Sequence, residues 1–155
     1  DWLTTQIPVN SKFQLVHFSN RAKAVLLDTD KQWQSTEKGE RLNEAMEALR
    51  EITPKGGSNL AAAFQSINQM SPKPDAVFLL TDGLPTQDAG GSRSGMVSGR
   101  QRLKWFAEAT RSLPKELPVN VILFPMEGDP LAASSYWQLA QISGGSFMSP
   151  SRDWP

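Results

Sequence analysis

Residues 75–86, DAVFLLTDGLPT, decide the fold class of this chain, because they join a short apolar run to a polar turn. Residues 76–80 read AVFLL, and an unbroken apolar run of this length is typical of a parallel strand covered on both faces. Thr81, Asp82 and Gly83 then end the run with residues that favour a turn. We therefore predict a central strand of a parallel sheet, with Asp82 at its carboxyl end.

Apolar residues recur at helical and strand-like spacings on both sides of this run. The spacings predict helices at residues 37–52, 60–67, 103–113 and 131–142, and further strands at residues 12–18, 22–27, 119–124 and 146–148. The strands at 12–18 and 22–27 are expected to form a hairpin with a three-residue turn, and residues 84–99 a long surface loop. Because strands alternate with helical segments, the chain is predicted to be an α/β domain with a mostly parallel sheet.

The composition limits the classes of function that the chain can have. Its 155 residues form a single domain, 1–155, and 16 Lys and Arg balance 16 Asp and Glu, so no net positive field favours nucleic acid. No apolar run approaches the roughly 18 to 20 residues that cross a bilayer, so we expect no membrane insertion by this segment. The absence of cysteine excludes thiolate metal sites, and the single histidine, His17, is expected in the core.

Asp82 is the first candidate functional residue. Ligands of open α/β sheets bind outside the carboxyl ends of the strands, which is where Asp82 is predicted to lie. A carboxylate beside a glycine suits a hard cation such as Mg²⁺, which prefers oxygen ligands. The alternative reading is an aspartate that caps the following turn.

The second candidate is GGSN at residues 56–59, which leads into a predicted helix. The first amide groups of a helix and its positive dipole end can hold an anion. The alternative is an ordinary helix N-cap, supplied by Ser58 or Asn59 after a flexible turn. The spacings of a phosphate loop or a dinucleotide-binding fold are absent from the chain.

Three segments together resemble the von Willebrand factor A domain in their order and spacing. They are FQLVHFSNRA at 13–22, ITPKGGSNLAAAF at 52–64 and DAVFLLTDGLPT at 75–86, and VNVILF at 119–124 and LAQISGG at 139–145 extend the resemblance over nearly the whole chain. The resemblance implies a Rossmann-like, doubly wound, mostly parallel sheet with one antiparallel edge strand and helices on both faces.

The resemblance also implies a metal-ion-dependent adhesion site. There a divalent cation, Mg²⁺ or Mn²⁺, accepts a carboxylate from a protein partner. By resemblance Ser58 takes the place of the family's threonine ligand and Asp82 that of its aspartate. A hydroxyl ligand adds no negative charge, which leaves the cation able to attract an acidic partner. The chain would then be a non-enzymatic protein-interaction module.

The family's DxSxS motif does not occur in residues 1–155. We expect either an N-terminally truncated piece of a longer polypeptide, whose first strand carries the motif, or a divergent member that has lost it. The second case predicts a metal-independent scaffold of the same fold. A third reading is a metal-assisted phosphate-ester hydrolase, with Asp82 as ligand and the GGSN amides as phosphate cradle, although no general base or nucleophile is visible.

Basic residues gather in residues 93–115. This stretch is either a docking patch for an acidic partner beside Asp82 or the solvated face of a helix. Trp105 lies beside the apolar stripe of the helix predicted there, so we expect it to be half exposed. The stretch contains one acidic residue, Glu108, and six basic residues. The basic residues are Arg93, Arg100, Arg102, Lys104, Arg111 and Lys115.

Overall fold

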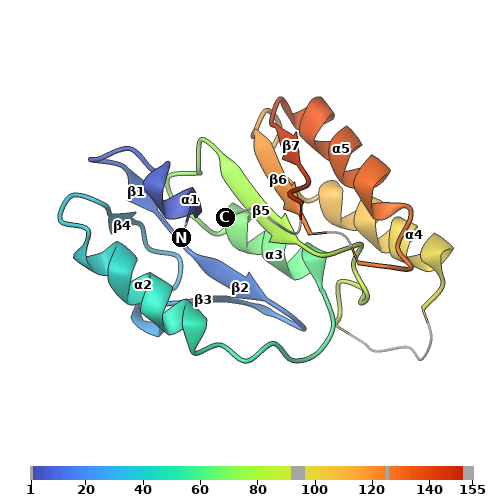
Figure 1. Cartoon of the computed structure of the whole chain (residues 1–155), viewed down its shortest axis with the longest axis horizontal. Helices are drawn as coiled ribbons and strands as arrows, with labels where there is room; N and C mark the ends of the chain where they lie inside the picture. Colours follow the sequence, from blue (N-terminus) through green and yellow to red (C-terminus); the bar gives the residue numbers. More distant parts are fainter. Residues whose placement is uncertain (1, 92–96, 125, 152–155) are drawn as a thin grey trace.

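The chain contains both strands and helices, which alternate from residue 60 onward, in a computed structural model that describes residues 2–91, 97–124 and 126–151 (Figure 1). In chain order they are α1 (Trp2–Thr5), β1 (Lys12–Phe13), β2 (Val16–Phe18), β3 (Ala22–Ala24), the 3₁₀ helix η1 (Leu27–Thr29), β4 (Gln34–Ser35), α2 (Glu40–Arg50), α3 (Leu60–Asn68), β5 (Val77–Thr81), α4 (Gly99–Thr110), β6 (Val119–Leu123), α5 (Ala132–Ser143) and β7 (Phe147–Met148). The expected mixed α/β class is confirmed.

Strands β5, β6 and β7 form a three-stranded parallel sheet with β6 in the middle. Leu79 of β5 lies opposite Val121 of β6, which in turn lies opposite Phe147 of β7. The strand expected at residues 76–80 is present one residue further along the chain. Asp82 therefore follows β5 directly, at its carboxyl end, as predicted.

One face of this sheet is covered by α3, α4 and α5. Leu79 and Val121 belong to the same buried cluster as Phe64 of α3, Phe106 of α4 and Tyr136 of α5. The rings of Phe106 and Tyr136 meet edge to face, with centroids 5.0 Å apart and planes at 83°. This edge-to-face geometry is one that aromatic pairs prefer, and it joins α4 to α5 beneath the sheet.

The opposite face of β5 is open in the described part of the chain. Phe78 and Leu80 alternate with the buried Leu79 and are 52% and 47% exposed. Helix cover on both faces, which the family resemblance implied, is thus not seen at β5 among these residues. These two side chains make an exposed apolar area on this face of β5.

The expected hairpin is present as β2 and β3. Val16 lies opposite Ala24 and Phe18 opposite Ala22 in antiparallel register, and the backbone N–H of Ser19 donates to the carbonyl of Arg21 across the turn at 3.1 Å. The antiparallel pairing is as predicted. However, the hairpin forms a sheet of its own, rather than the edge of the parallel sheet.

The single strand expected at residues 12–18 is divided at Gln14. Its side-chain amide donates to the carbonyl oxygens of Thr29 at 2.5 Å and Gln32 at 2.9 Å. Phe13 in β1 pairs with Gln34 in β4, whereas the carbonyl of Leu15 still accepts from the N–H of Val25 beside β3 at 2.8 Å. Neither β4 nor η1 was expected, because two or three residues carry no periodic signal.

Strands β2 and β5 both pack on α3, but no backbone pairing joins them in the described segments (Figure 1). The parallel register directs Val77 and Thr81 toward β6, where they bond to Pro118 and Phe124. The N–H and C=O groups of the alternate residues of β5 therefore point away from β6, toward a side with no neighbouring strand. β5 is thus an edge strand on its β2 side.

Two further expectations concern the burial of Trp105 and the presence of a membrane-spanning helix. Trp105 is 9% exposed, so the expected half-exposed position is wrong: α4 buries it together with Phe106 and Ala109. None of the helices described is both long and apolar enough to cross a membrane.

Candidate functional site

The segment after β5 begins with the exposed Asp82 and then enters the core. Leu84 and Gln87 are each 1% exposed, and Pro85 is also fully buried. We expected a surface loop from residue 84 onward. The first part of that stretch is instead packed like an element of the fold, which restricts where Asp82 can lie.

Ser58 is tied to this segment by three hydrogen bonds. Its backbone N–H donates to the hydroxyl oxygen of Thr86 at 2.8 Å, and its carbonyl accepts from the N–H groups of Thr86 at 3.0 Å and Gln87 at 3.3 Å. The turn that carries Ser58 and the loop that starts at Asp82 are therefore joined at the carboxyl end of β5. The two predicted metal ligands lie on these two joined segments.

Asn59, and not Ser58, caps α3. Its side-chain oxygen accepts from the N–H of Ala62 at 2.9 Å, and its side-chain amide donates to the carbonyl of Asn20 at 3.2 Å and that of Ala89 at 3.4 Å. This decides between the two candidate caps, and it leaves the Ser58 hydroxyl without a capping role. It also means that one of the amides expected to cradle an anion already has a partner.

Asn20 and Gln87 are site residues that the sequence analysis missed. The side-chain oxygen of Asn20 accepts from the N–H of Gly57 at 3.2 Å and from the side-chain amide of Gln87 at 2.9 Å. A Cβ on Gly57 would lie 2.8 Å from the Gln87 side chain, so any larger residue would displace that side chain. The one sequence signal was the glycine pair itself, which marks a close approach without naming what approaches.

The other side of the Asp82 loop is held by a buried ion pair. Asp129, whose side chain is 6% exposed, accepts through Oδ2 from Arg102 at 2.7 Å and from the N–H of Leu84 at 2.7 Å. Arg102 also donates to the carbonyls of Leu84 and Pro85. A carboxylate this buried needs such partners, because an unpaired charge in the interior is costly.

Tyr136 is the third side chain, after Asp129 and Arg102, that bonds to the backbone of the loop after Asp82. Its hydroxyl donates to the carbonyl of Gly83 at 3.0 Å. Burial raises the pKa of Tyr136, so the hydroxyl stays protonated and keeps its proton for this bond. A Cβ on Gly83 would lie 2.6 Å from Oδ2 of Asp129, which explains the glycine after Asp82.

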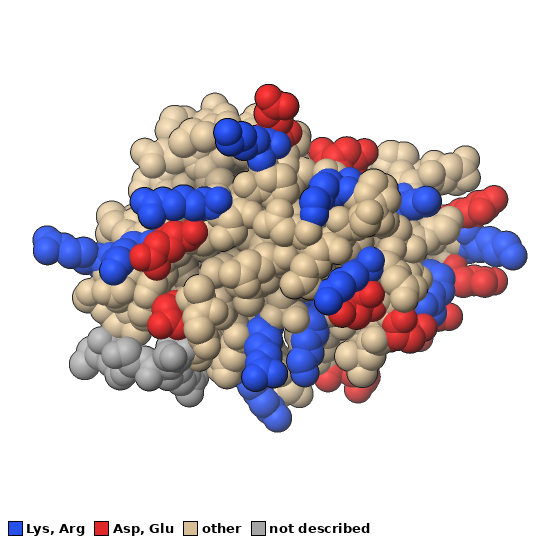
Figure 2. Space-filling model, turned by 180° about the vertical axis from the view of Figure 1, so that it is seen from behind, with Lys and Arg blue, Asp and Glu red and all other residues tan. Residues whose placement is uncertain are grey.

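The predicted basic patch is interrupted in the structure. Arg102 forms a buried ion pair with Asp129. Lys104 forms an exposed ion pair with Glu108, in which Nζ lies 3.8 Å from Oε1. Arg93 lies outside the described residues. Figure 2 shows side chains of both signs distributed over the back of the molecule, as expected for a solvated surface.

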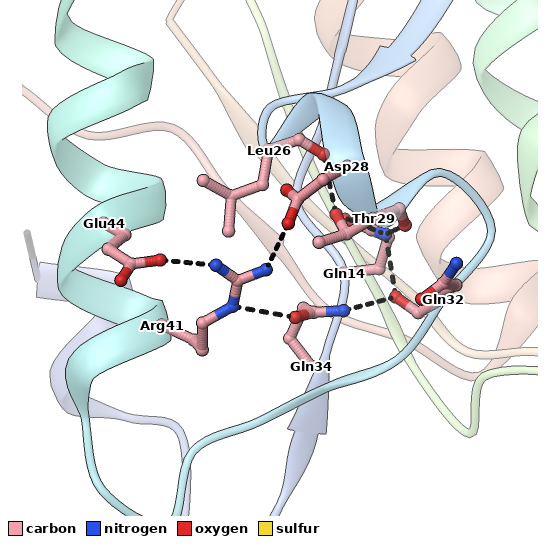
Figure 3. A network of polar contacts seen from close by, with 8 residues as sticks. All are labelled: Gln14, Leu26, Asp28, Thr29, Gln32, Gln34, Arg41 and Glu44. Atoms are coloured by element: carbon pink, nitrogen blue, oxygen red, sulfur yellow. Dashed lines mark hydrogen bonds and ion pairs between the residues drawn. The ribbon is translucent and has the colours of Figure 1, made fainter.

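An open groove of about 680 Å³ lies between η1 and α2. Arg41 reaches into it and donates to Asp28 at 3.0 Å, to Gln34 at 3.1 Å and to Glu44 (Figure 3). The hydrogen bonds to Asp28 and Glu44 raise the pKa of Arg41. This network joins η1, β4 and α2, so we assign it a structural role.

The two predicted ligands, the Ser58 hydroxyl and the Asp82 carboxylate, both offer the oxygen atoms that Mg²⁺ prefers. Mg²⁺ takes six oxygen ligands and usually keeps several waters, so these two groups fit the ion but form only part of its shell. Among the described residues, no three histidine, cysteine or acidic side chains gather in a metal-binding group.

Comparisons with known proteins leave the family of this chain open. No protein-family model matches the sequence. Searches of curated proteins and of solved structures found no match either. The resemblance to the von Willebrand factor A domain therefore stays a prediction that rests on the quoted segments.

Proposed function

We propose that this chain is a non-enzymatic protein-interaction module of the von Willebrand factor A type. It binds an acidic residue of a partner protein through Mg²⁺ or Mn²⁺ at the carboxyl end of β5. The observation that carries the proposal is the set of hydrogen bonds from Ser58 to Thr86 and Gln87, because they hold the Ser58 turn against the loop that begins at Asp82.

The two proposed ligands contribute different groups to the binding of the cation. Asp82 supplies one negative charge, and the Ser58 hydroxyl supplies an oxygen without charge. A cation held by these groups and by water keeps a net positive charge, so it attracts a carboxylate into an open coordination position. The partner's acidic residue would then bind both to the metal and to the surface around it.

The interruption of the sheet between β2 and β5 supports the finer fold proposal, a Rossmann-like doubly wound sheet. The family resemblance places a first strand in the middle of the sheet, and no strand of the described residues pairs with the edge of β5 that faces away from β6. We propose that a strand outside the described residues pairs there and carries the DxSxS ligands.

A metal-independent scaffold of the same fold is the second candidate. It is favoured by the finding that no three histidine, cysteine or acidic side chains form a metal-binding group in the described part of the chain. The phosphate-ester hydrolase has less support, because three amides of the proposed GGSN cradle already have partners. Those of Gly57, Ser58 and Asn59 donate to Asn20, Thr86 and Ser19.

Paramagnetic Mn²⁺ tests the proposal without requiring the partner. With the ion at sub-stoichiometric amounts, we expect the amide NMR signals of Ser58, Asp82 and Gly83 to broaden selectively. Asp82→Asn should abolish this broadening, whereas Asp75→Asn, at the opposite end of β5, should leave it unchanged. Equal broadening in the wild type and in Asp82→Asn would reject Asp82 as a ligand. No selective broadening in the wild type would favour the metal-independent scaffold.

A further inference from the structure

We infer that the buried pair of Arg102 and Asp129 is the positioning element of the candidate site. It fixes the loop of residues 83–87 and, through that loop, both Asp82 and Ser58. The functional meaning of this positioning rests on the function proposed above, but the positioning itself depends only on contacts within the chain.

Side chains from outside the loop hold four backbone groups in succession. Tyr136 binds the carbonyl of Gly83, and Asp129 binds the N–H of Leu84. Arg102 binds the carbonyls of Leu84 and Pro85. The three side chains come from α4, from α5 and from the connection between β6 and α5. The loop is therefore held by the body of the domain rather than by its own turn.

The contacts reach both predicted ligands. Asp82 directly precedes the held Gly83, and its own carbonyl accepts from the N–H of Met126 at 3.2 Å. On the other side, Thr86 immediately follows the held Pro85 and bonds to Ser58 in both directions. A shift of the loop would consequently move the Asp82 backbone and the Ser58 turn relative to each other.

The charge of the pair is what makes this arrangement sensitive. Both Arg102 and Asp129 are largely withdrawn from water, with side chains 19% and 6% exposed. Removing one partner leaves the other charge buried without compensation, which favours a rearrangement that brings water or a new partner to it. The loop of residues 83–87 lies directly against both groups, so it is the part that would rearrange.

Amide hydrogen exchange in the full chain tests the positioning. Asp129→Asn keeps an acceptor for Leu84 but removes the charge, and Arg102→Lys keeps the charge but loses the forked contact with the loop carbonyls. In both variants we expect exchange at Leu84 and Ser58 to be at least about tenfold faster, as loss of a charge-assisted hydrogen bond implies. Val121 in β6 should keep its wild-type rate.

The control is Lys104→Gln on the same helix, which removes only the exposed pair with Glu108 and should change neither rate. Unchanged exchange at Ser58 in Asp129→Asn and Arg102→Lys would overturn the inference. An equal acceleration at Val121 would also overturn it, because the pair would then support the whole fold and not the loop. The milder Tyr136→Phe variant leaves the charge pair intact and removes the hydroxyl that bonds to Gly83 and contacts Thr81, so it provides the same test if a charge variant does not fold.

Mn²⁺ binding distinguishes the positioning from the proposed function. If Mn²⁺ broadens Ser58 in the wild type, Arg102→Lys should weaken the apparent affinity by about tenfold while exchange at Val121 stays unchanged, a result that a purely structural role would not produce. If the wild type shows no Mn²⁺ effect, the metal proposal fails, and the exchange rates at Leu84 and Ser58 alone decide the positioning.

Discussion

Ser58 and Thr86 are joined by two hydrogen bonds that run in opposite directions. The backbone N–H of Ser58 donates to the Thr86 hydroxyl at 2.8 Å, and the N–H of Thr86 donates to the Ser58 carbonyl at 3.0 Å. The two residues are 28 positions apart in the chain. This pair therefore brings the turn before α3 and the loop after β5 into one structural unit, on which the proposed metal site depends.

Thr86→Val tests this unit. The substitution keeps the shape of the side chain but removes the acceptor of the Ser58 N–H, and a part-buried donor without a partner costs roughly 1–3 kcal/mol. We expect a loss of that size in the free energy of unfolding, measured by urea denaturation. Thr53→Val, at an exposed position, is the control and should stay within about 0.5 kcal/mol of the wild type. Equal stability of both variants would show that the bond contributes little.

Gly57→Ala tests the close contact with Gln87. Its Cβ would lie 2.8 Å from Gln87 and from the Thr86 hydroxyl, so the polar contacts around Asn20 must shift. We expect a destabilisation of roughly 1–3 kcal/mol, as in other overpacked sites. Gly99→Ala, in the first turn of α4, has its nearest contact at 3.8 Å and should be neutral or stabilising. Thermal unfolding of the two variants separates these outcomes, and a Gly57→Ala protein as stable as Gly99→Ala would contradict the packing.

The stability of the chain should decline at alkaline pH because of Tyr136. Burial raises the pKa of its hydroxyl in the folded state, so the unfolded chain loses the proton first as pH rises above the ordinary tyrosine pKa of about 10. The contribution of the protonated Tyr136 hydroxyl to the free energy of unfolding is complete below that pH. It is lost progressively as pH rises toward the folded-state pKa.

Tyr136 is the only tyrosine, so its ionisation can be followed directly by absorbance. We expect tyrosinate to form at a higher pH in the folded protein than in denaturant. Tyr136→Phe should also show a shallower loss of stability between about pH 10 and 11 than the wild type. Identical ionisation curves in the native and denatured protein would mean that the hydroxyl is not buried as described.

The open edge of β5 predicts self-association. Phe78 and Leu80 are exposed on β5, whose outer edge pairs with no strand in the described part of the chain. Such an edge is a template for pairing with another chain. We expect concentration-dependent association in sedimentation experiments, reduced by Leu80→Lys. Ile142→Lys, at an apolar side chain of α5 that is 87% exposed, should have no such effect. Equal association in both variants would place the contact elsewhere.

The sequence predicted those elements that have a periodic or unbroken apolar pattern. The strand before Asp82, the hairpin at Ser19 and helices α2 to α5 were all found within a few residues of their expected bounds. In each case a local pattern of side chains matches the face that the element buries. The division at Gln14 was not predictable, because it depends on carbonyl groups at Thr29 and Gln32 that the fold brings near.

The candidate site was predictable only in part, for the same physical reason. Asp82 was predicted at the end of a strand, and it lies there. Its surroundings depend on pairs that are distant in sequence, such as Arg102 with Asp129 and Asn20 with Gln87. Arg102 had been read as one of several surface cations, because nothing in its local sequence distinguishes a buried ion-pair partner from a solvated one.

The most direct test of the central claim is thermal unfolding of the chain with chelator, with millimolar Mg²⁺ and with millimolar Mn²⁺. An ion that binds only the folded state stabilises it, by about 2.7 kcal/mol at a hundredfold excess over Kd. We predict a higher Tm with either ion in the wild type and in Asp75→Ala, and no increase in Asp82→Ala. A wild-type Tm that is the same with chelator and with both ions would contradict the claim that Ser58 and Asp82 hold a cation.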